Sequence, residues 1–290
     1  MALSRLLVLQ LDSVPWPVLK PLMDAGRAPR LKALYERGCS GTLRSTVPPI
    51  TPAAWATFMT GVRPGRHGIL NFKGFDPRRQ SYCVADARHL SERNIYRRLA
   101  LAGKRVGVAM QPSTHPPFDV NGFCLTGFDS PGLSAPFAHP RELEAEILAL
   151  CPEHGQNFNL HSLWAKPARE GEDVLPRNLE AAAGQMRRVA KLALDLHARH
   201  PVDVLAVYFQ APDVVLHKAW PYCLPEGGQE NPARREAVAR FFGAMDAACG
   251  DLIDGFGGAG RLSRWRSATT GTSRRGTRSS STRCSPRAAS

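Results

Sequence analysis

The chain has 290 residues, of which 43% are hydrophobic and 22% charged, and its formal net charge is +13. This composition is typical of a globular protein with a buried core, and it excludes a wholly disordered chain. No apolar run is long enough to span a membrane, and the seven cysteines contain no CxxC pair, so we expect no membrane span, no disulfide framework and no cysteine zinc site in a reduced, cytoplasmic protein.

Strand and helix patterns alternate along the chain. Apolar runs typical of buried strands cover residues 5–11, 42–47, 106–110 and 202–209. Apolar residues at helical spacing cover residues 19–35, 53–59, 95–102, 140–150, 179–200 and 232–253. Strands that alternate with helices predict an α/β fold with a mainly parallel sheet flanked by helices. We expect residues 1–257 to form this core.

The positive charge is concentrated near the C-terminus. Residues 261–290 contain eight arginines and no acidic residue, so they carry eight of the thirteen net positive charges. Gly, Ser, Thr and Arg dominate this region without hydrophobic periodicity, which predicts a disordered tail over residues 258–290. The alternative is a basic arm that binds nucleic acid or another anion. The segment has no lysine and no amphipathic period, so nucleic acid is the less favoured partner.

Two acidic residues follow predicted buried strands. Asp12 follows residues 5–11, and Asp213 follows residues 202–209 in the string APDVVLHKAW. Functional groups of open α/β sheets gather beyond the carboxyl ends of strands. His217 comes four residues after Asp213, so the two side chains can share one face of a helical turn, and both are good zinc ligands. The alternative is that Asp213 caps a helix and His217 has no functional role.

Thr51 is expected at the start of a helix, directly after Pro48, Pro49 and Ile50. The first turn of a helix offers free N–H groups and the positive end of the helix dipole to a phosphate. Beside a dication, a threonine hydroxyl can lose its proton and attack phosphorus. The alternative is that Thr51 only caps the helix.

Together, these patterns resemble the type I phosphodiesterase/nucleotide pyrophosphatase family of the alkaline phosphatase superfamily. The resemblance rests on Asp12 after a buried strand, the segment PPITPAAWATFMTG with the HGI that follows it, and PDxxxH after another strand. Residues 111–132 (QPSTHPPFDVNGFCLTGFDSPG) also resemble a segment of bacterial members. The similarity runs in the same order over most of residues 5–257, and it implies an alkaline-phosphatase-like catalytic core.

The resemblance implies hydrolysis of a small phosphate ester or nucleotide-like substrate with two divalent metal ions, zinc or alternatively manganese. Thr51 is similar in position to the family's nucleophile, which forms a covalent phospho-intermediate. Asp12 and Thr51 would bind one metal ion, and Asp213 and His217 would bind the other. The usual glycine after the first aspartate is Ser13 here.

Two further positions follow from the same resemblance. His67 of the HGI string matches a family position, and we interpret it as a packing residue rather than a metal ligand. Residues 133–200 correspond to a cap or insertion, the kind of segment that sets substrate specificity in this superfamily. The pattern of these residues does not identify the substrate or the oligomeric state.

The resemblance also implies metal ligands that the chain lacks. A further strand ending in a Ser-Asp-His-Gly-like motif would complete one site, and a late histidine the other, but no histidine follows His217 and no acidic residue follows Asp254. Zinc sites normally have three or four protein ligands, so we expect weak metal occupancy and impaired activity. A catalytically inactive remnant of the fold is the alternative.

A shifted reading frame is one explanation for these missing ligands. One permitted choice of codons for residues 264–272 encodes Val-Ala-Val-Ser-Asp-His-Gly-His in another frame. This segment stands where the missing strand and motif are expected. We therefore hypothesise that the C-terminal part of the chain is truncated or frameshifted relative to the family.

Overall fold

The computed structural model describes residues 5–76, 80–90, 94–158, 160–165, 172–224, 231–257 and 262–269. The strands are β1 (Arg5–Asp12), β2 (Lys73–Asp76), β3 (Ser81–Val84), β4 (Val106–Gln111), β5 (Phe123–Thr126), β6 (Ala138–His139), β7 (Val204–Phe209) and β8 (Leu262–Thr269). The helices are α1 (Trp16–Asp24), α2 (Pro29–Arg37), α3 (Thr51–Thr60), α4 (Pro64–His67), α5 (Ile95–Leu101), α6 (Leu143–Leu150), α7 (His161–Ala165), α8 (Val174–Arg199), α9 (Ala211–Ala219) and α10 (Pro232–Gly257). Short 3-10 turns lie at η1 (Ala87–Leu90), η2 (Gly132–Ser134), η3 (His154–Asn157) and η4 (Trp220–Tyr222).

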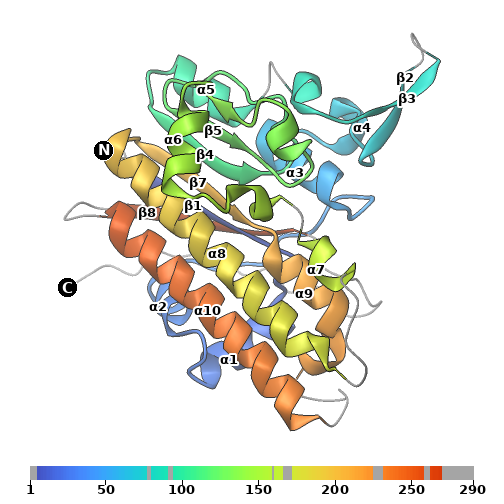
Figure 1. Ribbon diagram of the computed structural model, residues 1–290, viewed down its shortest axis with the longest axis vertical. Coiled ribbons are helices and arrows are strands. Elements are labelled where there is room, and N and C mark those ends of the chain that lie inside the picture. The colour runs from blue at the N-terminus through green and yellow to red at the C-terminus, as the bar shows by residue number, and fades with distance from the viewer. Residues whose placement is uncertain are drawn as a thin grey trace.

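A six-stranded sheet with the order β6-β5-β4-β7-β1-β8 forms the centre of the fold. Its neighbouring strands pair in parallel except β5 and β6, which pair antiparallel. Helices α8 and α10 lie side by side over one face, and α3 and α5 pack on the other (Figure 1). The predicted α/β fold with a mainly parallel sheet flanked by helices is therefore confirmed.

The two central strands show why the sheet is covered on both faces. All six residues of β7 are buried, and so are the last six residues of β1. Runs without polar alternation are typical of parallel strands that have helices on both sides. Along β1, Leu7 packs with the α8 and α10 layer, whereas Val8 packs with Ala56 and Met59 of α3. Because side chains alternate along a strand, Asp12 points to the same face as Val8, toward α3.

A buried carboxylate ties α10 to α2. Asp246 is 2% exposed and accepts hydrogen bonds from the main-chain N–H groups of Arg30 (3.0 Å) and Leu31 (2.8 Å). These groups lie in the first turn of α2, which has no capping side chain of its own. We predict that Asp246→Ala lowers the free energy of unfolding by about 2 kcal/mol, because two helix N–H groups lose their acceptor.

Urea denaturation of the variant measures this effect. The matched control is Asp251→Ala, which removes an exposed carboxylate from the same helix and is expected to change the free energy of unfolding by less than about 0.5 kcal/mol. Equal losses in the two variants would show that Asp246 does not act as the cap of α2.

Two segments differ from the sequence predictions. Residues 42–47 form no strand, so that prediction is wrong, and exposed Leu43 and Val47 show that its apolar side chains are not buried against a sheet. Within the predicted tail, Leu262–Thr269 forms β8 and pairs in parallel with β1 along its whole length. The main-chain groups of β1 provide this pairing, which does not require the apolar periodicity on which the prediction relied. Residues 258–261 and 270–290 lie outside the described residues.

Residues 133–200, expected to form a cap or insertion, contain β6, α6, α7 and α8. The long helix α8 contacts β4, β7 and α10, so it belongs to the layer that covers the sheet (Figure 1). A cap formed by the other elements of this segment stays a prediction. No helix in the described ranges has the length and apolar character needed to cross a bilayer.

Candidate active site

Asp12 and Asp213 lie at the same edge of the sheet. Asp12 is the last residue of β1, and Asp213 lies in the first turn of α9, which follows β7. Since β1 and β7 are neighbouring parallel strands, their carboxyl ends meet at this edge. Asp213 does not cap α9, because the N-cap residue is Gln210. The structure therefore does not support the capping role considered for Asp213.

A serine hydroxyl joins the two carboxylates. Ser13 Oγ donates a short hydrogen bond to Asp213 Oδ1 and lies 3.4 Å from Asp12 Oδ1. His217 Nε2 lies 3.4 Å from the same Asp213 Oδ1. Asp12 is 1% exposed, whereas the His217 side chain is 63% exposed, so this row of polar side chains leads from the buried end of β1 to the surface.

Tyr208 occupies the other oxygen of Asp12. Its hydroxyl donates a buried hydrogen bond of 2.5 Å to Asp12 Oδ2, and its ring packs edge-on against Trp55 of α3, with the ring centroids 5.1 Å apart. Burial, together with the charge of Asp12, raises the pKa of the Tyr208 phenol well above its usual value. The phenol therefore stays protonated and holds Asp12 in one orientation.

Thr51 is the first residue of α3, and Pro52 follows it in the first turn. The N-cap residue is Ile50, and no side chain makes a capping hydrogen bond there, so the hydroxyl of Thr51 is not used as a cap. Thr51 precedes Trp55 by one helical turn, which places both on the side of α3 that faces Tyr208. Trp55 packs against Tyr208, which donates a hydrogen bond to Asp12, but no hydrogen bond joins Thr51 itself to Asp12 within the described residues.

Both ring nitrogens of His67 have partners. Nδ1 accepts a hydrogen bond from the Ile69 N–H (3.1 Å), and Nε2 lies 3.0 Å from Thr57 Oγ1. Burial lowers the pKa of this histidine. These contacts agree with the interpretation of His67 as a packing residue.

A third carboxylate, Asp129, lies near this site, and no sequence motif points to it as a functional residue. Its Oδ2 accepts a 2.8 Å hydrogen bond from the Ser113 N–H, and no described residue donates to its buried Oδ1. The preceding residue, Phe128, stacks on Tyr208 with the ring centroids 6.2 Å apart. Burial raises the pKa of Asp129 to about 6, and its charge contributes to the raised pKa of Tyr208. Asp129 follows strand β5 just as Asp12 ends β1, so recognising β5 would have identified it.

The raised pKa of Asp129 predicts a pH-dependent stability. The folded state binds this proton more tightly than the unfolded chain, so the contribution of Asp129 is present below about pH 4 and is lost as the pH rises through about 6. The free energy of unfolding falls by at most about 3 kcal/mol for this reason. We expect Asp129→Asn to become progressively more stable than the unmodified protein over this range in urea denaturation. A constant difference, or the same trend in the surface control Asp24→Asn, would contradict the prediction.

The pKa of a histidine from another element responds to the charges at the exposed end of the row. His161 begins α7, and burial lowers its pKa, with opposing effects from the charges of Asp213 and His217. Sequence reasoning had no signal for His161, since α7 is a short helix within a segment expected to form a cap or insertion.

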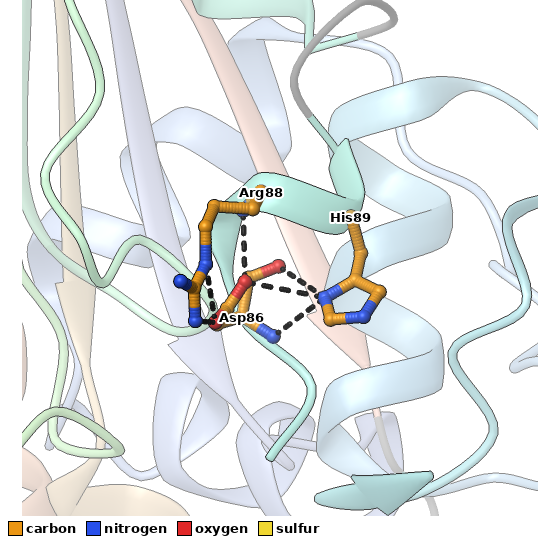
Figure 2. Close-up of polar contacts among 3 residues, drawn as sticks. All are labelled: Asp86, Arg88 and His89. Carbon is orange, nitrogen blue, oxygen red and sulfur yellow. Dashed lines mark hydrogen bonds and ion pairs between the residues drawn. The ribbon is translucent and has the colours of Figure 1, made fainter. Parts of the chain in front are cut away.

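A separate cluster of charged residues has a structural role (Figure 2). Asp86 precedes the 3-10 turn η1 and accepts hydrogen bonds from the Arg88 N–H (2.9 Å) and from Arg88 Nε (2.9 Å), while His89 Nδ1 lies 3.2 Å from its Oδ1. Burial alone would raise the pKa of Asp86, but the hydrogen bonds and charge of Arg88 outweigh it and hold the pKa below its usual value. The carboxylate is therefore engaged in fixing the start of η1.

The donors of the candidate site have the chemistry of metal ligands. The 3.4 Å between Asp213 Oδ1 and His217 Nε2 is close to the separation of about 3.3 Å between two ligands bound about 2.0 Å from one tetrahedral zinc ion. This pair therefore fits one dication. The described parts of the chain contain no group of three or more His, Cys, Asp or Glu side chains arranged to hold a metal ion.

Comparisons with known proteins agree with this fold. The family model for type I phosphodiesterase/nucleotide pyrophosphatase matches residues 6–262, which confirms the resemblance drawn from the sequence motifs. The phosphonoacetate hydrolase of Sinorhizobium meliloti 1021, solved with phosphonoacetate, is 19% identical with a TM-score of 0.55, over 86% of this chain and 53% of that one. Murine ectonucleotide pyrophosphatase/phosphodiesterase 5, solved with AMP, is 15% identical with a TM-score of 0.47, over 86% and 51%. The chain spans about half the length of these structures, and no curated protein matches it.

Proposed function

Because the chain belongs to the type I phosphodiesterase/nucleotide pyrophosphatase family, we propose that its candidate site hydrolyses phosphate ester bonds of a small, nucleotide-like substrate. The observation that carries this proposal is the row of polar contacts at the carboxyl edge of the sheet, in which Tyr208 donates to Asp12 and Ser13 donates to Asp213 while lying 3.4 Å from Asp12. In an open α/β sheet this edge is where ligands bind.

Thr51 is the proposed nucleophile. Its hydroxyl gives up its proton and the oxygen attacks phosphorus, the bond from phosphorus to the leaving oxygen breaks, that oxygen takes up a proton and departs as an alcohol, and a phosphothreonine ester forms. Water then hydrolyses this ester and regenerates the hydroxyl. The free N–H groups in the first turn of α3 supply hydrogen bonds to the phosphate oxygens. The position of Thr51 in this turn, with no capping bond from its side chain, supports the role.

Asp12 and Thr51 would hold one divalent ion, and Asp213 and His217 the other. Zinc, or alternatively manganese, would supply positive charge that stabilises the attacking and leaving oxygens. Tyr208 orients the Asp12 carboxylate through its 2.5 Å hydrogen bond. With two protein donors for each ion, we propose that occupancy is weak and that turnover is impaired.

The test measures zinc and manganese content together with turnover of a chromogenic phosphodiester by the purified full chain. Turnover that depends on added metal and requires Thr51 supports the proposal. A folded protein that neither binds metal nor turns over substrate supports the catalytically inactive remnant instead. The incomplete ligand set of the described residues is the observation that favours this second candidate.

The register of β8 supports the hypothesis of a shifted frame. Thr269 pairs with Asp12, and the aspartate codon of the alternative frame overlaps codons 268 and 269. An Asp-His pair in that frame would therefore stand at the end of β8, beside Asp12. A chain expressed with this frame is predicted to bind zinc at least about tenfold more tightly. The hypothesis fails if the gene contains no such frame, or if the altered chain gains no affinity.

A further inference from the structure

Ser13 is the residue through which the two carboxylates of the candidate site make contact. Its hydroxyl donates to Asp213 Oδ1 and lies 3.4 Å from Asp12 Oδ1. The carboxylates belong to different elements, β1 and α9, and Ser13 and Asp213 are 200 residues apart in the chain. A contact between such distant segments fixes how the end of β1 and the start of α9 face one another.

The backbone of Ser13 lies in the left-handed region, with φ of 58°. Glycine adopts this conformation without strain, whereas a residue with a Cβ atom does not. Glycine at this position would relieve the strain but would also remove the hydroxyl. Alanine would remove the hydroxyl and keep the strain. The two substitutions therefore separate the backbone effect of Ser13 from the effect of its hydrogen bond.

We propose that Ser13 is a positioning residue that orients Asp213 toward Asp12 and His217, and that it thereby strengthens metal binding at the site of the proposed function, on which this inference rests. The oxygen that accepts the Ser13 hydrogen bond, Asp213 Oδ1, is also the oxygen that lies 3.4 Å from His217 Nε2. Fixing that oxygen fixes the pair that fits one dication. Hydrogen bonds to metal-binding side chains typically change metal affinity by 10- to 100-fold.

A double-mutant cycle in the metal-free full chain tests the contact itself. The variants are Ser13→Ala, Asp213→Ala and the double variant, and urea denaturation gives each unfolding equilibrium constant. The hydrogen bond to a carboxylate predicts that Ser13→Ala changes this constant about tenfold more when Asp213 is present than when it is absent. Additive effects would overturn the proposal. Ser13→Gly serves as the second variant, and its difference from Ser13→Ala is expected to be the same with and without Asp213.

Titration with Zn²⁺, and with Co²⁺ followed by its visible absorption, tests the orientation of the metal-binding pair. Both Ser13→Ala and Ser13→Gly are expected to bind these ions about tenfold more weakly than the unmodified chain. Unchanged affinity in both variants would overturn the positioning role, because a purely structural turn residue would not alter it.

The two measurements separate this inference from the proposed function. Coupling between Ser13 and Asp213 in a chain that hydrolyses no phosphodiester would support the contact and overturn the proposed function. Thr51-dependent hydrolysis without coupling between Ser13 and Asp213 would support the proposed function and overturn the role of Ser13. If the unmodified chain binds neither ion under conditions that keep it folded, the role of Ser13 in metal binding is overturned whatever the cycle shows.

Discussion

Replacing Thr51 by alanine is expected to abolish phosphodiester hydrolysis, with kcat at least about a thousandfold lower. The substitution removes the proposed attacking oxygen. It leaves α3 intact, because Thr51 makes no capping hydrogen bond and Pro52 keeps its place in the first turn of the helix. The free energy of unfolding should therefore change by less than about 0.5 kcal/mol. Initial rates with a chromogenic phosphodiester, measured with zinc and with manganese, give the result.

Two variants on the same helix serve as controls for Thr51→Ala. Thr60→Ala removes a hydroxyl that bonds to the Ala56 carbonyl at the other end of α3, and it should keep the rate of the unmodified chain. Thr51→Ser keeps a hydroxyl at the position of attack and should retain part of the activity. If Thr51→Ala kept more than about a tenth of the rate, Thr51 would not be the nucleophile.

The central strands and the two strand-end aspartates could be predicted because buried parallel strands leave a simple pattern. The β1 and β7 segments are mainly apolar runs; Asp12 ends the first, and Asp213 comes four residues after the second. Since β1 and β7 are adjacent parallel strands, their carboxyl ends meet at one edge of the sheet, and Asp12 and Asp213 lie there together. His217 followed from helical spacing within α9.

The remaining members of the site depend on contacts that no local pattern encodes. Tyr208 lies inside a run in which every residue is buried, so its hydroxyl could not be distinguished from ordinary packing before Asp12 was placed beside it. In the sequence, Ser13 stands out only as a departure from the family's glycine, whereas its bond to Asp213 joins distant segments. Asp129 was missed because β5 is only four residues long.

Strand β8 is a part of the fold that no local sequence pattern predicts. Its sequence lacks an apolar pattern, and the strand forms through main-chain pairing with β1. Such pairing depends on an open strand edge, which is a property of the assembled sheet. The segment 42–47 shows the converse, since its strand-like residues belong to neither of the two sheets of the described chain and Val47 is 86% exposed.

Asp12 holds the Tyr208 hydroxyl and is also a proposed metal ligand, and substitution at two positions separates the structural role from the proposed one. Asp12→Ala leaves the buried hydroxyl of Tyr208 without the acceptor that it has in the structure. We expect the free energy of unfolding to fall by about 2 kcal/mol for this reason. We also expect phosphodiester hydrolysis to fall at least about a hundredfold, because the proposed ligand of one metal ion is lost.

The double variant Asp12→Ala/Tyr208→Phe also removes the Tyr208 hydroxyl, which has lost its acceptor in Asp12→Ala. It should regain about 1 kcal/mol of the lost stability, because the buried Tyr208 hydroxyl that lost its acceptor is no longer present, but its rate should stay as low as that of Asp12→Ala. Tyr208→Phe alone keeps the carboxylate and loses only its orienting bond, so its rate should fall about tenfold. Urea denaturation and initial rates on the same four proteins give both quantities. A double variant that regained activity together with stability would show that Asp12 serves only to satisfy Tyr208, and would remove it from the proposed metal site.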